Sequence, residues 1–223
     1  MGDEQVKENE VKKIKHVYSR GSEHKELIED NPFVDVAAFL FLEDIADKQG
    51  AAGMNNYLMS LATSLAKSMP EEKYDTWEQF LDAVRRGEST ISTFENIITP
   101  TDNCIVTTKC PFSRAWSEYT RRIGHFSKIH YDVAEYYNST VKPGAIDTMC
   151  IIHQTFRSAA AERIKVGGKP VRYAQIACVS PEGAKKIAPE EWLPILLEKA
   201  GITKTEMNMV LRNNTCLWIL YIG

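Results

Sequence analysis

The pattern of apolar and polar residues predicts a charged leader followed by two helices. Residues 1–30 mix Lys and Glu with few apolar side chains, so we expect a flexible leader that contributes little to a core. Apolar residues then recur at helical spacing over residues 32–49. A second helical run begins after Gly50 or Gly53 and ends at Pro70. Small residues along the second run permit close approach, so we expect the two helices to form an antiparallel pair.

A third helix and a change to β-rich composition follow. The helix is expected to begin after a cap at Asp75 or Thr76 and to end at Gly87. Beyond it, Thr, Ile, Val and Asn dominate residues 90–99 and again residues 103–110. A Pro-Thr-Asp-Asn turn separates these two runs, which is typical of a β-hairpin or of adjacent strands.

The rest of the chain alternates between helical and strand periodicity. Helices are expected over residues 113–140 with a break at Gly124, over 148–165 and over 189–200, and strands over 171–179 and 215–222. Gly167-Gly168 is interpreted as the C-cap of the central helix, 148–165. Without a linker or repeat, the pattern predicts an α+β fold with a helical N-terminal layer packed on a small, mostly antiparallel sheet. Residues 31–223 are expected to form a single domain.

Composition narrows the classes of function. The net charge is −3 and the pI is near 6.0, so the chain lacks the concentrated positive charge of nucleic-acid-binding proteins. No apolar run reaches the roughly 20 residues that cross a bilayer, and the N-terminus is charged. Five cysteines without tight spacing suit reduced thiols. We expect a cytoplasmic protein without a membrane span or nucleic-acid partner.

Candidate chemistry concentrates at the start of the central helix. Asp147 follows Pro-Gly and is expected to be the N-cap, which places Cys150 at the third helical position. His153 and Arg157 follow on the same stripe. A cysteine in the first turn lies at the positive end of the helix dipole, which favours the thiolate. The alternative interpretation is that Cys150 and His153 only pack in the core.

Two interpretations that assign a chemical role to this region are open. The first is a zinc or iron site formed by Cys110, Cys150, His153 and Cys178, because thiolate and imidazole ligands together suit these metals. The second is nucleophilic catalysis by Cys150 or Cys110, with His153 or His130 as the base and Arg157 holding a carboxylate.

A third interpretation, which we favour, is a pocket without catalysis. Its lining would be mostly apolar and aromatic, and Cys, His and Arg groups would orient the ligand. The candidate ligand-binding residues are Cys110, His130, Tyr131, Tyr137 and Phe156. Tyr at helical spacing also occurs in ordinary packing, so enzyme and binding module both stay open. A small-molecule ligand is expected, and a homodimer is kept as an option.

The order of elements resembles a known family. Over roughly residues 33–180, a helical pair, a third helix, a hairpin, a helix with Cys150 in its first turn and a strand with Cys178 resemble the 4-vinyl reductase-like, hydrocarbon-binding domain, whose fold is related to TRAPP transport subunits. This resemblance implies an apolar ligand. The Cys110-Pro111 step after a strand is similar to the amino-thiazoline carboxylate hydrolase-like family. That similarity implies hydrolysis of a small heterocyclic or carboxylate-bearing substrate.

Overall fold

The fold is taken from a computed structural model of the whole chain. It describes residues 17–18, 32–92, 96–98, 104–109, 113–125, 127–142, 144–179, 185–211 and 215–223. Cys110 lies outside these described residues, as do most of the leader and the turn of the predicted hairpin.

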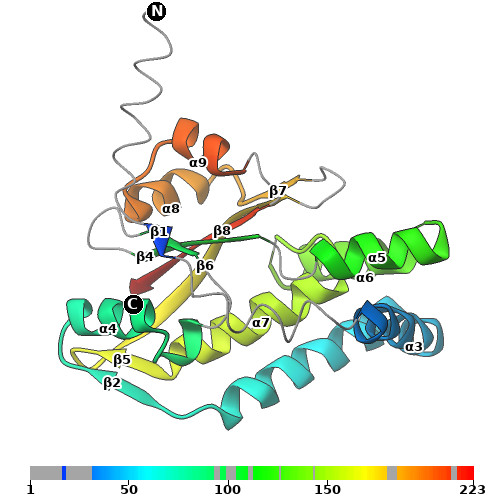
Figure 1. Cartoon of the computed structure of the whole chain (residues 1–223), viewed down its shortest axis with the longest axis horizontal. Coiled ribbons are helices and arrows are strands. Elements are labelled where there is room, and N and C mark those ends of the chain that lie inside the picture. Colours follow the sequence, from blue (N-terminus) through cyan, green and yellow to red (C-terminus); the bar gives the residue numbers. More distant parts are fainter. Residues whose placement is uncertain are drawn as a thin grey trace, which may run out of the picture.

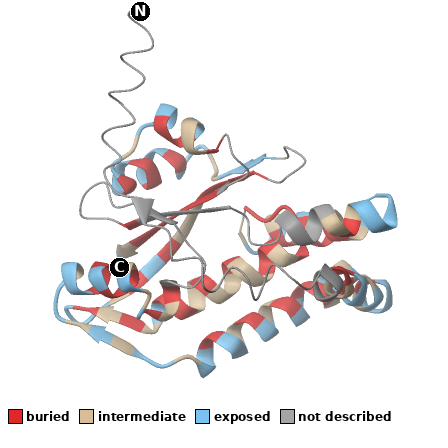
Figure 2. Ribbon diagram, viewed as in Figure 1, coloured by how far each residue is buried: buried red, intermediate tan, exposed pale blue. Residues whose placement is uncertain are grey.

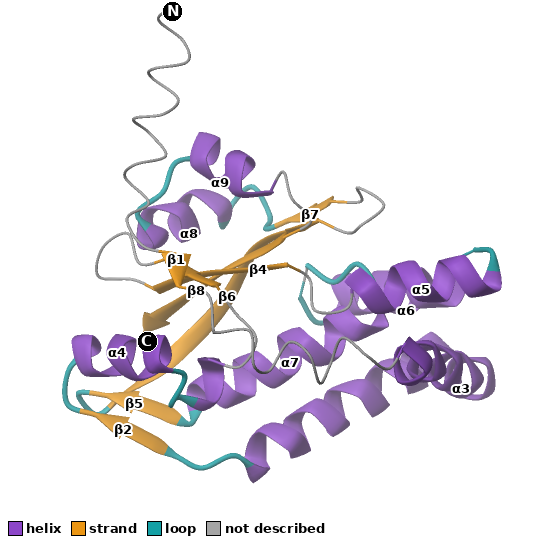
Figure 3. Ribbon diagram, viewed as in Figure 1, coloured by secondary structure: helices purple, strands orange, loops and turns teal. Residues whose placement is uncertain are grey.

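The described strands form one mixed, mostly antiparallel sheet (Figure 3). Its order is β1-β3-β4-β8-β6-β5-β2, and β7 pairs with β6. Only the pairing of β2 with β5 is parallel among the described strands. The strands are β1 (Val17–Tyr18), β2 (Glu72–Tyr74), β3 (Asn96–Ile98), β4 (Cys104–Lys109), β5 (Ile164–Val166), β6 (Lys169–Val179), β7 (Lys185–Ile187) and β8 (Thr215–Ile222).

Helices cover both faces of the sheet (Figure 1). They are α3 (Pro32–Ser68), α4 (Trp77–Arg86), α5 (Ser113–Ile123), α6 (Lys128–Thr140), α7 (Thr148–Glu162), α8 (Leu193–Ala200) and α9 (Lys204–Val210). On one face α8 and α9 pack against β6 and β8. On the other face α7 packs on β6, and α3 packs against α7, α6 and α5. The predicted α+β class with a helical N-terminal layer is therefore confirmed.

The first two predicted helices are two arms of one bent helix. Helix α3 continues from Pro32 to Ser68, and only Gly50 has non-helical dihedrals, with φ 69° and ψ 176°. Glycine reaches this positive φ without a Cβ clash. Figure 1 shows the arms running in different directions from the bend. The predicted antiparallel pair is wrong. A single non-helical residue bends the helix, and no loop separates the two arms to let the second fold back along the first.

Gly167 and Gly168 form a hairpin turn rather than a helix cap. Helix α7 ends at Glu162 with Arg163 as its C-cap. The chain then forms β5 and turns into β6, with Val166 paired to Lys169. Both glycines have positive φ, 56° and 78°, as a two-residue type I′ turn requires. The C-cap interpretation was wrong because it overlooked a three-residue strand.

Buried side chains form two clusters, one on each face of the sheet (Figure 2). The larger cluster lies among α3, α4, α6, α7 and the sheet. The smaller lies between the sheet and helices α8 and α9. Within the described part of the chain, no helix is long and apolar enough to cross a membrane.

Candidate functional site

Helix α7 begins as the sequence predicts. The Asp147 side chain accepts a hydrogen bond from the Cys150 backbone N–H at 3.0 Å and caps the helix. Asp147 is fully buried, and burial raises the pKa of its carboxyl to about 6. The N-cap that fixes the helix start is therefore also a buried titratable group.

The buried face of α7 combines apolar residues such as Ile151 with polar ones. Cys150, Gln154 and Arg157 are 7%, 1% and 3% exposed. By contrast, the apolar residues Met149, Ile152 and Phe156 are only partly buried. The reason is that α7 packs between the sheet and α3, so both of its sides are covered. The side chains that could take part in chemistry therefore lie in the interior of the protein rather than facing solvent.

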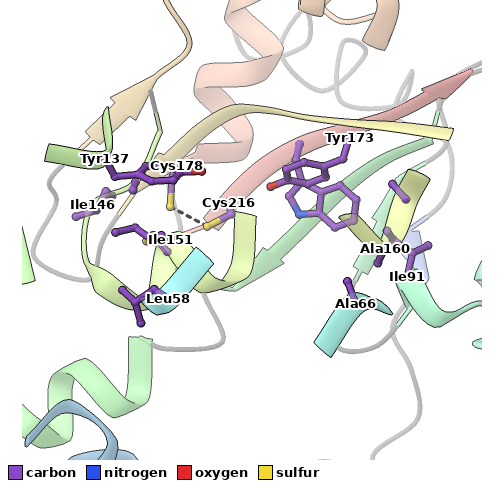
Figure 4. Packing of buried hydrophobic residues seen from close by; sticks show 14 of the residues in the cluster. Leu58, Ala66, Ile91, Tyr137, Ile146, Ile151, Ala160, Tyr173, Cys178 and Cys216 are labelled. Carbon is purple, nitrogen blue, oxygen red and sulfur yellow. Dashed lines mark hydrogen bonds between the residues drawn. The ribbon is translucent and has the colours of Figure 1, made fainter. Parts of the chain in front are cut away.

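Three cysteines meet between α7 and the sheet. Cys178 on β6 lies opposite Cys216 on β8, and their sulfur atoms are 2.7 Å apart (Figure 4). The Cys150 thiol hydrogen-bonds to Cys178. This hydrogen bond and burial raise the pKa of Cys150 well above its usual value. The hydrogen bond to Cys178 and burial both favour the neutral thiol, so the structure does not support the expected thiolate at the helix N-terminus.

His153 and Arg157 contact each other one turn apart on α7. The Arg157 Nε–H donates to His153 Nε2 at 2.6 Å, so this ring nitrogen is an acceptor and carries no proton. Burial lowers the pKa of His153 to about 4, which agrees with a neutral ring. Arg157 also donates to the Ile91 carbonyl at 3.1 Å and lies over the Trp218 ring at 4.6 Å. These contacts hold the guanidinium inside the core.

His130 belongs to a separate buried group. Its Nδ1 lies 2.9 Å from the Thr148 hydroxyl, and its Nε2 lies 3.4 Å from the Glu43 carboxylate on α3. The Tyr119 hydroxyl hydrogen-bonds to the same Glu43 oxygen. Burial lowers the pKa of His130 to about 4 although Glu43 opposes the shift. His130 therefore joins α6, α7 and α3 instead of facing the cysteines.

The predicted aromatic lining residues pack with the larger cluster. Tyr137 is fully buried in the larger cluster, and burial raises its pKa to about 12. Tyr131 and Phe156 are partly buried and pack against the same cluster. None of these three side chains lines the cavity described below. Among the described residues, no group of three or more His, Cys, Asp or Glu side chains is arranged to hold a metal ion.

A cavity of about 390 Å³ lies along an edge of β6. On this edge β6 pairs with β5 only at Lys169–Pro170 and with β7 only at Ala177–Val179. Residues from helix α8 and from the α6–α7 connection contribute to the lining of this cavity. We call it the lysine cavity; it is lined by Lys142, Gln154, Tyr173, Ala174, Gln175, Ala188, Pro189, Trp192, Ile195, Leu196, Lys199 and Tyr221.

Two lysines give this cavity its charge. Lys142 Nζ donates to Ser158 Oγ at 2.8 Å and lies 5.7 Å from the centre of the Tyr173 ring. Burial lowers the pKa of Lys142 to about 8. Lys199 Nζ lies 5.0 Å from the Tyr221 ring centre. Among the described residues the lining contains no Asp or Glu, and the carboxylate that acts on Lys142, Glu162, lies outside it, so the two lysines carry the charge of the lining.

Two buried polar side chains face the same space. Gln154 is 1% exposed, and neither its amide nitrogen nor its oxygen has a hydrogen-bond partner among the described residues. The Tyr173 hydroxyl is in the same state, and this side chain is 9% exposed. Buried polar groups are normally hydrogen-bonded, so these atoms are available to a bound molecule. Gln154 also links the cavity to the buried face of α7.

Sequence reasoning found the thiol and imidazole groups but missed the lysine cavity. Lys142 and Lys199 come from distant parts of the chain, and each alone resembles an ordinary surface lysine. Of the lining residues, Gln154 could have been found from the local sequence, because it shares a stripe of α7 with Cys150 and Arg157. Cys216 lies in a strand that the sequence predicts, but its position opposite Cys178 follows only from the strand order of the sheet.

No protein-family model, curated protein or solved structure matches this chain. The resemblances to the hydrocarbon-binding domain and to the hydrolase-like family therefore stay predictions, and the site is interpreted from its own geometry.

Proposed function

We propose that this chain is a small-molecule-binding protein whose lysine cavity takes a ligand with an anionic group and an apolar or aromatic body. The supporting observation is the lining itself, in which Lys142 and Lys199 supply positive charge and the described residues include no carboxylate. A volume near 390 Å³ lies within the range of roughly 300–1,000 Å³ typical of ligand pockets.

The apolar part of the ligand would contact α8. Trp192 and Ile195 line the cavity, yet each is 53% exposed. Large apolar side chains exposed beside a polar recess commonly mark a binding site. Gln154 and Tyr173 would hydrogen-bond to the ligand's polar atoms. The orienting groups in this proposal are thus Lys, Gln and Tyr, in place of the Cys, His and Arg that the sequence suggested.

A hydrolase is not supported by the same observations. Cys150 is buried, and its hydrogen bond to Cys178 together with burial raises the pKa of its thiol well above the usual value. His153 Nε2 accepts a hydrogen bond from Arg157, so this lone pair is already used and is not available to take a thiol proton. Binding is therefore the function that the geometry favours.

A pair of fluorescent probes tests the proposal. 1-Anilinonaphthalene-8-sulfonate is an aromatic anion, and N-phenyl-1-naphthylamine is its neutral analogue without the sulfonate. We expect the anion to bind the native chain more tightly than the neutral probe. The double variant Lys142→Met/Lys199→Met should weaken the anion about tenfold, since two partly exposed charge contacts contribute roughly 0.5–1 kcal/mol each.

The matched control is Lys185→Met/Lys186→Met on β7. These lysines are exposed and do not line the cavity, and the control removes the same charge. It should leave both probe affinities nearly unchanged. Equal weakening by the two double variants would show a nonspecific charge effect, and an unchanged anion affinity in the cavity variant would overturn the proposal.

A further inference from the structure

Three thiols lie in a row in the interior, outside the lysine cavity. Cys178 is 1% exposed, Cys216 is 5% exposed and Cys150 is 7% exposed. Cys178 occupies the centre, because it contacts Cys216 across the strands and Cys150 on α7. Figure 4 shows the Cys178 and Cys216 sulfurs pointing toward each other beneath the sheet.

The backbone already suits a bond between the two strand cysteines. Cys178 and Cys216 are directly opposite in the antiparallel pair of β6 and β8. Residues opposite each other in such a pair have Cα atoms about 4.5–5.5 Å apart, which lies within the roughly 4.4–6.8 Å that a disulfide spans. Their sulfur atoms, at 2.7 Å, are closer than ordinary nonbonded contact allows. The two strands need not move for these sulfurs to join.

We propose that Cys178 and Cys216 form a reversible disulfide on reaction with a peroxide, and that Cys150 is the thiol that exchanges with Cys178. Hydrogen peroxide is the oxidant class that fits, because it is uncharged and close to water in size. This inference does not depend on ligand binding in the lysine cavity.

The oxidation balances with one peroxide for each disulfide. One thiol sulfur attacks a peroxide oxygen and the O–O bond breaks; the thiol proton joins the leaving hydroxide, which gives a sulfenic acid and one water. The second sulfur then attacks the sulfenic sulfur, forms the S–S bond and releases the second water. The two sulfurs lose two electrons in total, and the two peroxide oxygens gain them.

Cys150 can then move the bond within the trio. Its sulfur attacks Cys178, a new S–S bond joins Cys150 to Cys178, and Cys216 leaves. The Asp147 carboxylate lies next to the Cys150 thiol and can take its proton. That proton ends on Cys216, so the exchange changes neither charge nor oxidation state. Because Cys178 contacts both other thiols, both disulfide isomers contain Cys178.

Disulfide mapping of the full chain tests this inference. The purified protein is treated with hydrogen peroxide, quenched in acid, blocked with N-ethylmaleimide in denaturant and digested without reduction for mass spectrometry. In the native sequence we expect a peptide pair joined through Cys178, mainly to Cys216, which dithiothreitol releases. Cys216→Ser should move the link to Cys150 and Cys178, and Cys178→Ser should remove every link within the trio.

Cys104 supplies the matched control. It is a fully buried thiol on β4, and burial raises its pKa to about 12, but it is not one of the three contacting sulfurs. Cys104→Ser should leave the Cys178–Cys216 link unchanged. The inference fails if the native sequence yields no link through Cys178, or if its main link joins Cys104 or Cys110 instead. The native-sequence result stands whether or not a variant folds.

Discussion

The two faces of the central sheet bury side chains of different kinds. Beneath α8 and α9, residues such as Ile176, Leu217 and Ile219 form an apolar cluster. The buried carboxylate of Glu206 on α9 is hydrogen-bonded within its own helix cap. Beneath α7, Asp147, Gln154 and Arg157 are buried beside the cysteines. Burying a polar group costs free energy unless a partner compensates, so the first face stabilises the fold and the second retains groups that packing alone does not require.

Strand β8 permits the most direct test of this comparison. Leu217 faces the apolar cluster, and its neighbour Cys216 faces α7. We expect Leu217→Ala to lower the free energy of unfolding by about 2–5 kcal/mol, since it leaves a cavity in a tightly packed cluster. Cys216→Ala should cost only about 1 kcal/mol under reducing conditions. Urea titration measures both, and similar losses would remove the distinction between the faces.

Asp147 should make stability depend on pH in an unusual direction. Its pKa rises from the ordinary aspartate value of 3.8 to about 6 in the folded chain, so between these values the folded state binds the proton that the unfolded state releases. Stability contributed by this group is therefore lost as pH rises through that window. The loss is on the order of 2–3 kcal/mol at neutral pH.

His130 and His153 act in the opposite sense. Burial lowers the pKa of each from 6.5 to about 4, so their contribution is lost as pH falls below about 6.5. Asp147→Asn keeps a good N-cap but removes the opposing carboxyl. We expect the variant to be more stable than the native sequence above pH 6 and to lose stability more steeply in acid. Chemical denaturation from pH 4 to 8 would contradict this if the two curves coincide.

Lys142 should give the smallest effect, a several-fold change in affinity. Its pKa is near 8, so an anion in the lysine cavity loses a charge partner as pH rises past that value. Binding of the naphthalene sulfonate should weaken between pH 7 and 9, whereas the neutral probe should not respond. Lys142→Arg keeps its charge over this range and should flatten the profile. A decline that persists in Lys142→Arg would assign the effect to another group.

Local sequence signals predicted the helices and strands better than they predicted which elements pack together. The Asp147 cap, the start of α7 and the pairing of β3 with β4 follow from short stretches of sequence. The burial of α7 did not, because the rule that one apolar stripe faces the core fails for a helix covered on both sides. The contact between Cys178 and Cys216 depends on the strand order. The presence of Lys142 and Lys199 in one cavity depends on where α8 packs.

The most direct test of the lysine cavity as a binding site is the indole N–H spectrum of ¹⁵N-labelled protein during titration with the naphthalene sulfonate. Of the four tryptophans, Trp192 lines the cavity, whereas Trp77 packs on Phe80 away from it. The Trp192 signal, assigned with Trp192→Phe, should shift and saturate with the fluorescence titration while the Trp77 signal stays fixed. A Trp192 signal that does not move at saturating probe would contradict the proposed site.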